Sequence, residues 1–177
     1  VYQRPYFRVL MSTVIVLNLT ASSYVTLLPI YAKDIIQGNE KTLGILWGFA
    51  GIGSLISSLR LASRQDFSDP KILLSINIGC CVLGLLLLGV TDIMALLCCA
   101  MFLLGFGIST TNILTNILMQ NATVETLRGR AISIYTSTRF GFDALGGLLV
   151  GLLAAWFLPH YVMLVYSFIL FLYLVRF

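Results

Sequence analysis

Charged residues are scarce in this chain of 177 residues. Asp, Glu, Lys and Arg make up 10% of it, hydrophobic residues make up 59%, and the mean hydropathy is +0.97. Soluble domains carry about 25% charged and about 45–50% apolar residues. The chain therefore lacks the polar shell of a water-soluble domain, which argues against a soluble enzyme, a nucleic-acid binder, a secreted disulfide scaffold and a disordered tail.

Residues that catalyse reactions or bind metals are also few. His160 is the single histidine, and the four cysteines form two adjacent pairs inside apolar runs, at Cys80–Cys81 and Cys98–Cys99. Cysteine in such a setting behaves as a small hydrophobe, and no metal-type spacing is present. The motifs of serine hydrolases, zinc proteases and P-loop proteins do not occur. We therefore expect no enzymatic activity, no metal site and no cofactor.

The sequence instead contains six long apolar blocks, at residues 9–31, 42–59, 72–90, 93–119, 131–158 and 161–177. Each of the first five is long enough to cross a hydrocarbon core of ~30 Å as a helix. The sequence predicts an all-α, multi-pass membrane bundle of six transmembrane helices. Because the last block is short and no initiator Met begins the chain, we also expect a fragment of a longer protein.

Basic residues are divided unevenly between the two sides of this predicted bundle. Only Lys33 and Lys41 fall on one side, whereas the other side carries Arg4, Arg8, Arg60, Arg64, Lys71, Arg128, Arg130 and Arg176. Basic loops remain in the cytoplasm, so both ends of the chain are predicted to be cytoplasmic. The net charge of +4 comes largely from these loops and does not indicate nucleic-acid binding.

Two ionisable residues, Arg139 and Asp143, interrupt the fifth block close to its middle. An ionisable side chain at the bilayer centre costs about 2.5–3.5 kcal/mol on insertion scales, so each requires a reason. They are four residues apart and share one helix face. Three interpretations remain open: a mutual ion pair, a structural tie to a neighbouring helix, and a substrate or proton site in a central cavity. If protons are coupled in this segment, Asp143 is the candidate carrier.

Polar stripes run along two other blocks. Asn18 and Ser22 lie four residues apart in the first block, near its predicted midplane, and are expected to line a cavity. Asn112 and Asn116 repeat the spacing in the fourth block. Amides of this kind usually join helices, so that stripe has two interpretations, helix packing and a substrate pathway.

Several stretches in order resemble helices seven, eight, ten and eleven of major facilitator superfamily transporters. They are residues 27–34, 42–44, 51–55, 116–120, 127–135 and 146–151. The resemblance covers nearly the whole chain and is strongest to the bacterial branch that includes enterobactin-exporter-like and macrolide-efflux-like proteins. It implies the C-terminal six-helix half of a twelve-helix transporter, with its N-terminal half missing from this sequence.

The resemblance also implies where a substrate site would lie. Helices seven and ten, here the first and fourth blocks, would line the cavity, and helix eleven would flank it. The loop with Arg60, Arg64 and Asp66 loosely resembles a cytoplasmic gate loop, and Arg128 and Arg130 belong to the following cytoplasmic loop. A solvated loop is the common alternative for such charges.

These observations predict secondary active transport by alternating access in the bacterial inner membrane. The expected partners are the lipid bilayer, a small amphipathic or drug-like molecule that is exported, and protons that drive the export. The alternative is a membrane-embedded structural or assembly module without transport, which would use the same helix-packing features.

Overall fold

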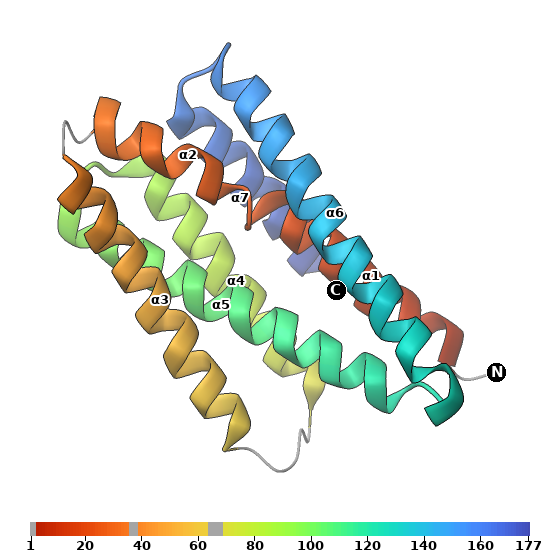
Figure 1. The fold of residues 1–177 in the computed structure, drawn as a ribbon. Coiled ribbons are helices and arrows are strands. Elements are labelled where there is room, and N and C mark those ends of the chain that lie inside the picture. Colours follow the sequence, from red (N-terminus) through yellow and green to blue (C-terminus); the bar gives the residue numbers. More distant parts are fainter. Residues whose placement is uncertain (1–2, 36–38, 64–68) are drawn as a thin grey trace.

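The computed structural model describes residues 3–35, 39–63 and 69–177, and it is a bundle of long helices (Figure 1). Every regular element in these ranges is helical, so the predicted all-α membrane bundle is confirmed. The helices are α1 (Gln3–Thr20), α2 (Tyr24–Ile30), the π-helical turn η1 (Tyr31–Ile35), α3 (Glu40–Ala62), α4 (Pro70–Val90), α5 (Met94–Asn121), the 3₁₀ turn η2 (Glu125–Leu127), α6 (Arg128–Ala154) and α7 (Pro159–Arg176).

Five segments are long and apolar enough to cross a bilayer: Phe7–Lys33, Glu40–Ala62, Pro70–Val90, Met94–Asn121 and Pro159–Arg176. The sixth long helix, α6, has 27 residues, about 40 Å of helix. It is less apolar because Arg139 and Asp143 lie within it. α6 is thus long enough to span a bilayer. Its two charged side chains at membrane depth require a stabilising interaction or a functional role.

Local sequence sets the helix starts. Asn39 caps α3, because its Oδ1 accepts hydrogen bonds from the backbone N–H groups of Lys41 at 3.1 Å and Thr42 at 3.4 Å. Pro70 and Pro159 begin α4 and α7. Proline suits the first turn of a helix, where its missing N–H would have no partner.

The first apolar block is not the single helix that its length suggests. α1 ends at Thr20 and α2 begins at Tyr24, and the backbone N–H groups of Ser23 and Thr26 bond three residues back instead of four. The side chains of Thr20 and Ser23 also bond the carbonyls four residues before them. Pro29 lacks an N–H for the carbonyl of Val25, so the helix is weakened from both sides of the break.

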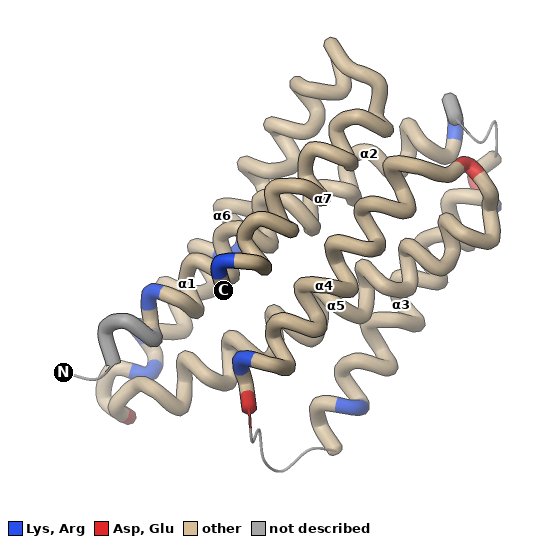
Figure 2. Tube along the Cα trace, turned by 180° about the vertical axis from the view of Figure 1, so that it is seen from behind, with Lys and Arg blue, Asp and Glu red and all other residues tan. Residues whose placement is uncertain are grey.

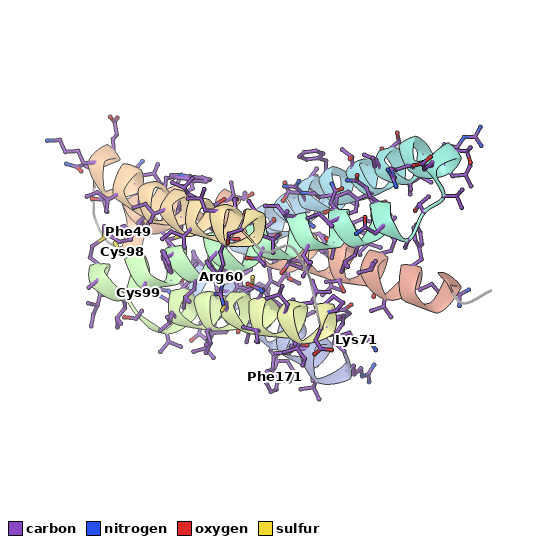
Figure 3. All side chains as sticks on the ribbon, turned by 90° about the horizontal axis from the view of Figure 1, so that it is seen from below. Phe49, Arg60, Lys71, Cys98, Cys99 and Phe171 are labelled. Carbon is purple, nitrogen blue, oxygen red and sulfur yellow. The ribbon has the colours of Figure 1, made fainter. Side chains whose placement is uncertain are left out.

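α3 and α6 lie at the front of Figure 1, α4 and α7 lie at the back, and α5 and α1 lie between them, as the view from below in Figure 3 also shows. α5 packs between α3 and α4, α4 packs on α7, and α1–α2 packs on α6. Figure 2, the view from behind, shows α4 and α7 covering the back of the bundle. The central α5 and the broken α1–α2 therefore have their inner faces toward the same front region.

Glycines allow the closest helix contacts. A methyl group on Gly105 of α5 would overlap the carbonyl oxygen of Ala50 in α3, and one on Gly53 would overlap the carbonyl oxygen of Phe102. Gly44 and Gly48, by contrast, have open space beside them. The glycines of α3 therefore lie on two faces of the helix. Gly53 packs tightly on α5, whereas Gly44 and Gly48 lie on an open face.

The charged residues divide between the two ends of the bundle (Figure 2). We call one the basic end; among the residues with described side chains it carries Arg8, Arg60, Lys71, Arg128, Arg130 and Arg176. The opposite end, here the Asp92 end, carries Lys33, Lys41, Asp92 and His160. His160 Nε2 lies 2.9 Å from Asp92 Oδ1, and the His160 ring lies beside that of Tyr31, with centroids 5.2 Å apart. These contacts join the starts and ends of three helices at the Asp92 end.

Candidate functional site

A depression opens in the middle of the bundle, where α3, α5, α6 and the break between α1 and α2 come together. Its volume is about 320 Å³. We call it the central depression; it is lined by Ser22, Tyr24, Val25, Trp47, Ala50, Gly51, Ser54, Gly105, Ile108, Ser109, Asn112 and Arg139. Three of the residues singled out from the sequence, on three different helical segments, therefore share one surface.

A chain of amide hydrogen bonds lies beneath this surface. Asn18 Nδ2 donates to the carbonyl oxygen of Val14 at 2.8 Å and to Asn112 Oδ1 at 3.2 Å, and the Ser22 hydroxyl donates to Asn18 Oδ1 at 3.3 Å. Asn18 is buried, with 1% of its surface exposed. It does not line the depression itself but holds Ser22 and Asn112, which do.

Arg139 reaches the central depression from α6. Its guanidinium carbon lies 5.1 Å from the centroid of the Phe140 ring, a cation–π contact that helps a charge at membrane depth. Among the side chains of residues 7–33, 39–63 and 69–177, no carboxylate lies within ion-pair distance of Arg139. The mutual Arg139–Asp143 ion pair, one of the three interpretations of this motif, is absent.

Asp143 does not line the central depression. It is half-buried one helical turn from Arg139, on the face that continues to Gly147. A methyl group on Gly147 would come within 2.9 Å of the Thr26 hydroxyl. This face of α6 is therefore turned toward the broken first helix, and Asp143 lies between the depression and the contact with α2.

Tyr135 fastens α6 to α5 on the basic-end side of Asn112. Its hydroxyl donates to the backbone carbonyl of Asn112 at 2.6 Å and lies 3.2 Å from the Thr115 hydroxyl. Only 2% of Tyr135 is exposed. This contact fixes the distance between α5 and α6, which form two walls of the depression.

The chain matches a family model of the major facilitator superfamily, described as transmembrane secretion effector, over residues 2–176. The chain belongs to this family. It is a multi-pass membrane transporter of the major facilitator type. No curated protein matches it.

Membership of this family relates the central depression to the place where such transporters bind their substrates. Transporters of this superfamily place their substrate sites at membrane depth between repeats of helices. The polar depression of this transporter lies near the middle of its long helices, and Arg139 of α6 is part of its lining. The back of the bundle presents an apolar surface, and Figure 3 shows Cys99 and Phe171 on the outside of the bundle.

The other residues singled out from the sequence lie away from the depression. Asn116 accepts a hydrogen bond from Gln120 Nε2 at 2.5 Å within α5, and it is not among the lining residues. Arg128 and Arg130 are exposed at the start of α6. Arg64 and Asp66 lie outside the residues that the structure describes.

Arg60 belongs to a second depression, at the basic end. Its guanidinium carbon lies 6.0 Å from the centroid of the Phe106 ring, and it lines a space of about 290 Å³ together with Asp69 and Asn77. Arg60 and Asp69 are not within ion-pair distance of each other.

Four lining residues were missed by the reading of polar stripes: Tyr24, Trp47, Ser54 and Ser109. Ser109 lies three residues before Asn112, so the helical face rule could have found it had the stripe been extended backwards. Trp47 is 41% exposed, with its ring centroid 6.4 Å from that of Tyr24. No sequence signal distinguishes such a tryptophan from a lipid-facing one.

Proposed function

We propose that this chain forms the C-terminal six-helix half of a secondary transporter that works by alternating access. The observation that carries the proposal is the central depression, a polar hollow at membrane depth with lining residues from α3, α5, α6 and the α1–α2 break. A helix bundle that served only as a scaffold would have no need to leave polar groups and an arginine open there. The strongest resemblance, to the enterobactin-exporter-like and macrolide-efflux-like branch, remains part of this proposal.

The transport is export of a small amphipathic molecule, driven by protons, across a bacterial inner membrane. Both ends of the segment lie in the cytoplasm, since the basic end is the side that the positive-inside rule retains there. Asp143 carries the coupled proton, because it is the acidic residue near the middle of the described spans and lies beside the broken first helix. A broken helix is the kind of element that can change its bend as the two halves rock.

The test is efflux from cells that lack their own exporters and express the native gene. Drug accumulation is measured over a broad panel, with and without an uncoupler. Transport predicts lower accumulation that the uncoupler reverses. No effect on any compound would contradict the proposal and favour a structural or assembly module.

The role of Asp143 is tested with Asp143→Asn. We expect the variant to reach the membrane and to lose uncoupler-sensitive efflux, because the amide cannot release a proton. Glu40→Gln is the matched control, since Glu40 is exposed at the start of α3, and it should transport normally. Efflux with unchanged rate and pH dependence in Asp143→Asn would remove Asp143 from the mechanism.

A further inference from the structure

We propose that the central depression binds the anionic group of an organic anion whose remaining body is aromatic or apolar. This inference rests on the proposed transport function and names the substrate class of the same site. It depends on the direction in which the polar groups of the depression point. Those groups present hydrogen-bond donors and a positive charge, and they include no acid.

The first donor is the amide nitrogen of Asn112, and the hydrogen-bond network fixes its direction. The backbone carbonyl of Val14 can only accept, so the atom of Asn18 that meets it at 2.8 Å is the amide nitrogen. The same nitrogen donates to Asn112, which must therefore present Oδ1 to it, at 3.2 Å. The opposite rotamer of Asn112 would set two N–H groups against each other. Asn112 Nδ2 is thus directed away from Asn18.

Asn112 Nδ2 has no hydrogen-bond partner in the part of the chain that the structure describes, and Asn112 is only 4% exposed. A buried donor without a partner is destabilising, so native proteins rarely leave one unless something else satisfies it. Asn112 lines the central depression. An acceptor atom of a molecule bound against Asn112 would supply the partner that this buried nitrogen lacks.

The second donor is the guanidinium of Arg139, which lines the same depression from the opposite helix, α6. Its five N–H groups match the two oxygens of a carboxylate, a sulfonate or a phosphate. Among the side chains described, none accepts a hydrogen bond from Arg139 or pairs with it. Asn112 and Arg139 therefore line one space from two helices, and neither Asn112 Nδ2 nor the Arg139 guanidinium has a hydrogen-bond partner among the described side chains.

The lining decides the sign of the ligand. Arg139 is the one charged residue among the lining residues, and Asp143 is not one of them. In a site of low dielectric constant, charge interactions are several times stronger than in water. A cationic amphiphile would be repelled by Arg139, whereas an anion would neutralise it. The hydroxyls of Ser54 and Ser109, which line the same space, add further groups able to donate to the anion.

The rest of the lining suits an aromatic or apolar body. The rings of Trp47 and Tyr24 lie together on one wall, and Gly51 has open space beside it. The volume of about 320 Å³ is at the lower end of the range for small-molecule sites. An anionic group held by Arg139 and Asn112 would place a ring system against the Trp47 wall.

The experiment compares two probes that differ in one group. Anilinonaphthalenesulfonate is an anion, and phenylnaphthylamine has the same rings without the sulfonate. The native protein is placed in lipid nanodiscs, and saturable probe fluorescence is measured against empty nanodiscs. We expect the anion to bind more tightly than the neutral amine. Arg139→Gln should weaken anion binding by about tenfold or more, and the neutral probe should change by less than about twofold.

Further variants separate charge from folding. Arg139→Lys should restore part of the anion binding, and Asn112→Ala should weaken it by about threefold to tenfold. Arg176→Gln is the matched control, because this exposed arginine lies at the end of α7. A variant that still binds the neutral probe is folded at the site.

Two results would overturn the proposal. One is tighter binding of the neutral amine than of the anion, or saturable binding of neither. The other is unchanged or tighter anion binding in Arg139→Gln, as expected if a carboxylate elsewhere in the protein already neutralises Arg139. The efflux assay above is independent of both probes, so export of neutral or cationic drugs alone would refute this inference and leave the transport function standing.

Discussion

Tyr135 shows how one hydroxyl can organise a membrane site. It bonds the Asn112 carbonyl at 2.6 Å and approaches Thr115 at 3.2 Å, which links α6 to the helix that carries the unpartnered amide. Asn112 is thus held at its backbone by Tyr135 and at its side-chain oxygen by Asn18. The remaining amide nitrogen is buried and has no hydrogen-bond partner among the described residues.

We predict that Tyr135→Phe lowers the free energy of unfolding by about 0.6–1.7 kcal/mol, the range for hydrogen bonds between membrane helices. The ring remains, so packing is preserved and only the hydroxyl contacts are lost. Thermal unfolding of the purified protein in detergent measures the change. Tyr161→Phe is the control, because Tyr161 is 61% exposed. Equal stability of the two variants would show that the Tyr135 bonds contribute nothing net.

At the scale of elements, the contact of α3 with α5 depends on the absence of side chains. Gly53 and Gly105 sit against backbone carbonyls of the facing helix, and backbone cannot move aside as a flexible side chain can. α5 also packs on α4 and borders the central depression. Displacing α3 would therefore widen the site as well as weaken the bundle.

We predict that Gly105→Ala destabilises the protein by about 1–3 kcal/mol, the usual cost of overpacking. Gly48→Ala should be neutral or stabilising, because Gly48 has open space beside it and alanine favours the helix by about 0.5–1 kcal/mol. The two variants add the same methyl group to neighbouring helices. Melting temperatures that fall equally would refute the close contact of α3 and α5.

At the scale of the whole molecule, the separation of charges predicts an orientation. The loop between α5 and α6 lies at the basic end, and the turn between α6 and α7 lies at the Asp92 end. Val124 and Leu158, one in each connection, are 63% and 65% exposed. The two residues are similarly exposed, and they lie beyond opposite ends of the same helix, α6.

We predict that a membrane-impermeant maleimide added to intact cells labels Leu158→Cys and spares Val124→Cys. The four native cysteines are first replaced by alanine, since Cys99 is exposed. Permeabilised cells should label both positions, which controls for reactivity. The reverse pattern would place the basic end outside and contradict the cytoplasmic assignment of the chain ends.

The sequence by itself determined that this protein is a bundle of membrane helices, because too few charges and six long apolar blocks leave no other way to satisfy the backbone in lipid. Spacing by fours placed Asn18 and Ser22 on one helix face and Asn112 on another, since the helical repeat alone fixes which residues share a face. Arg139 stood out because it is ionisable near the middle of an apolar block. The same spacing placed Asn116 beside Asn112 on the polar stripe of α5. Asn116 instead bonds Gln120 within α5 and is not among the residues that line the depression.

Only the tertiary structure decided which of these residues meet. The break after Thr20 arises from several weak backbone preferences acting together, and none of them is strong enough to be read in isolation. Trp47, Ser54 and Ser109 joined the site because α3 and α5 approach closely at their glycines. The direction of the Asn112 amide follows from a bond to Asn18, which is 94 residues away in the chain. Local sequence fixes the face of a helix, but the partner opposite that face depends on packing between distant segments.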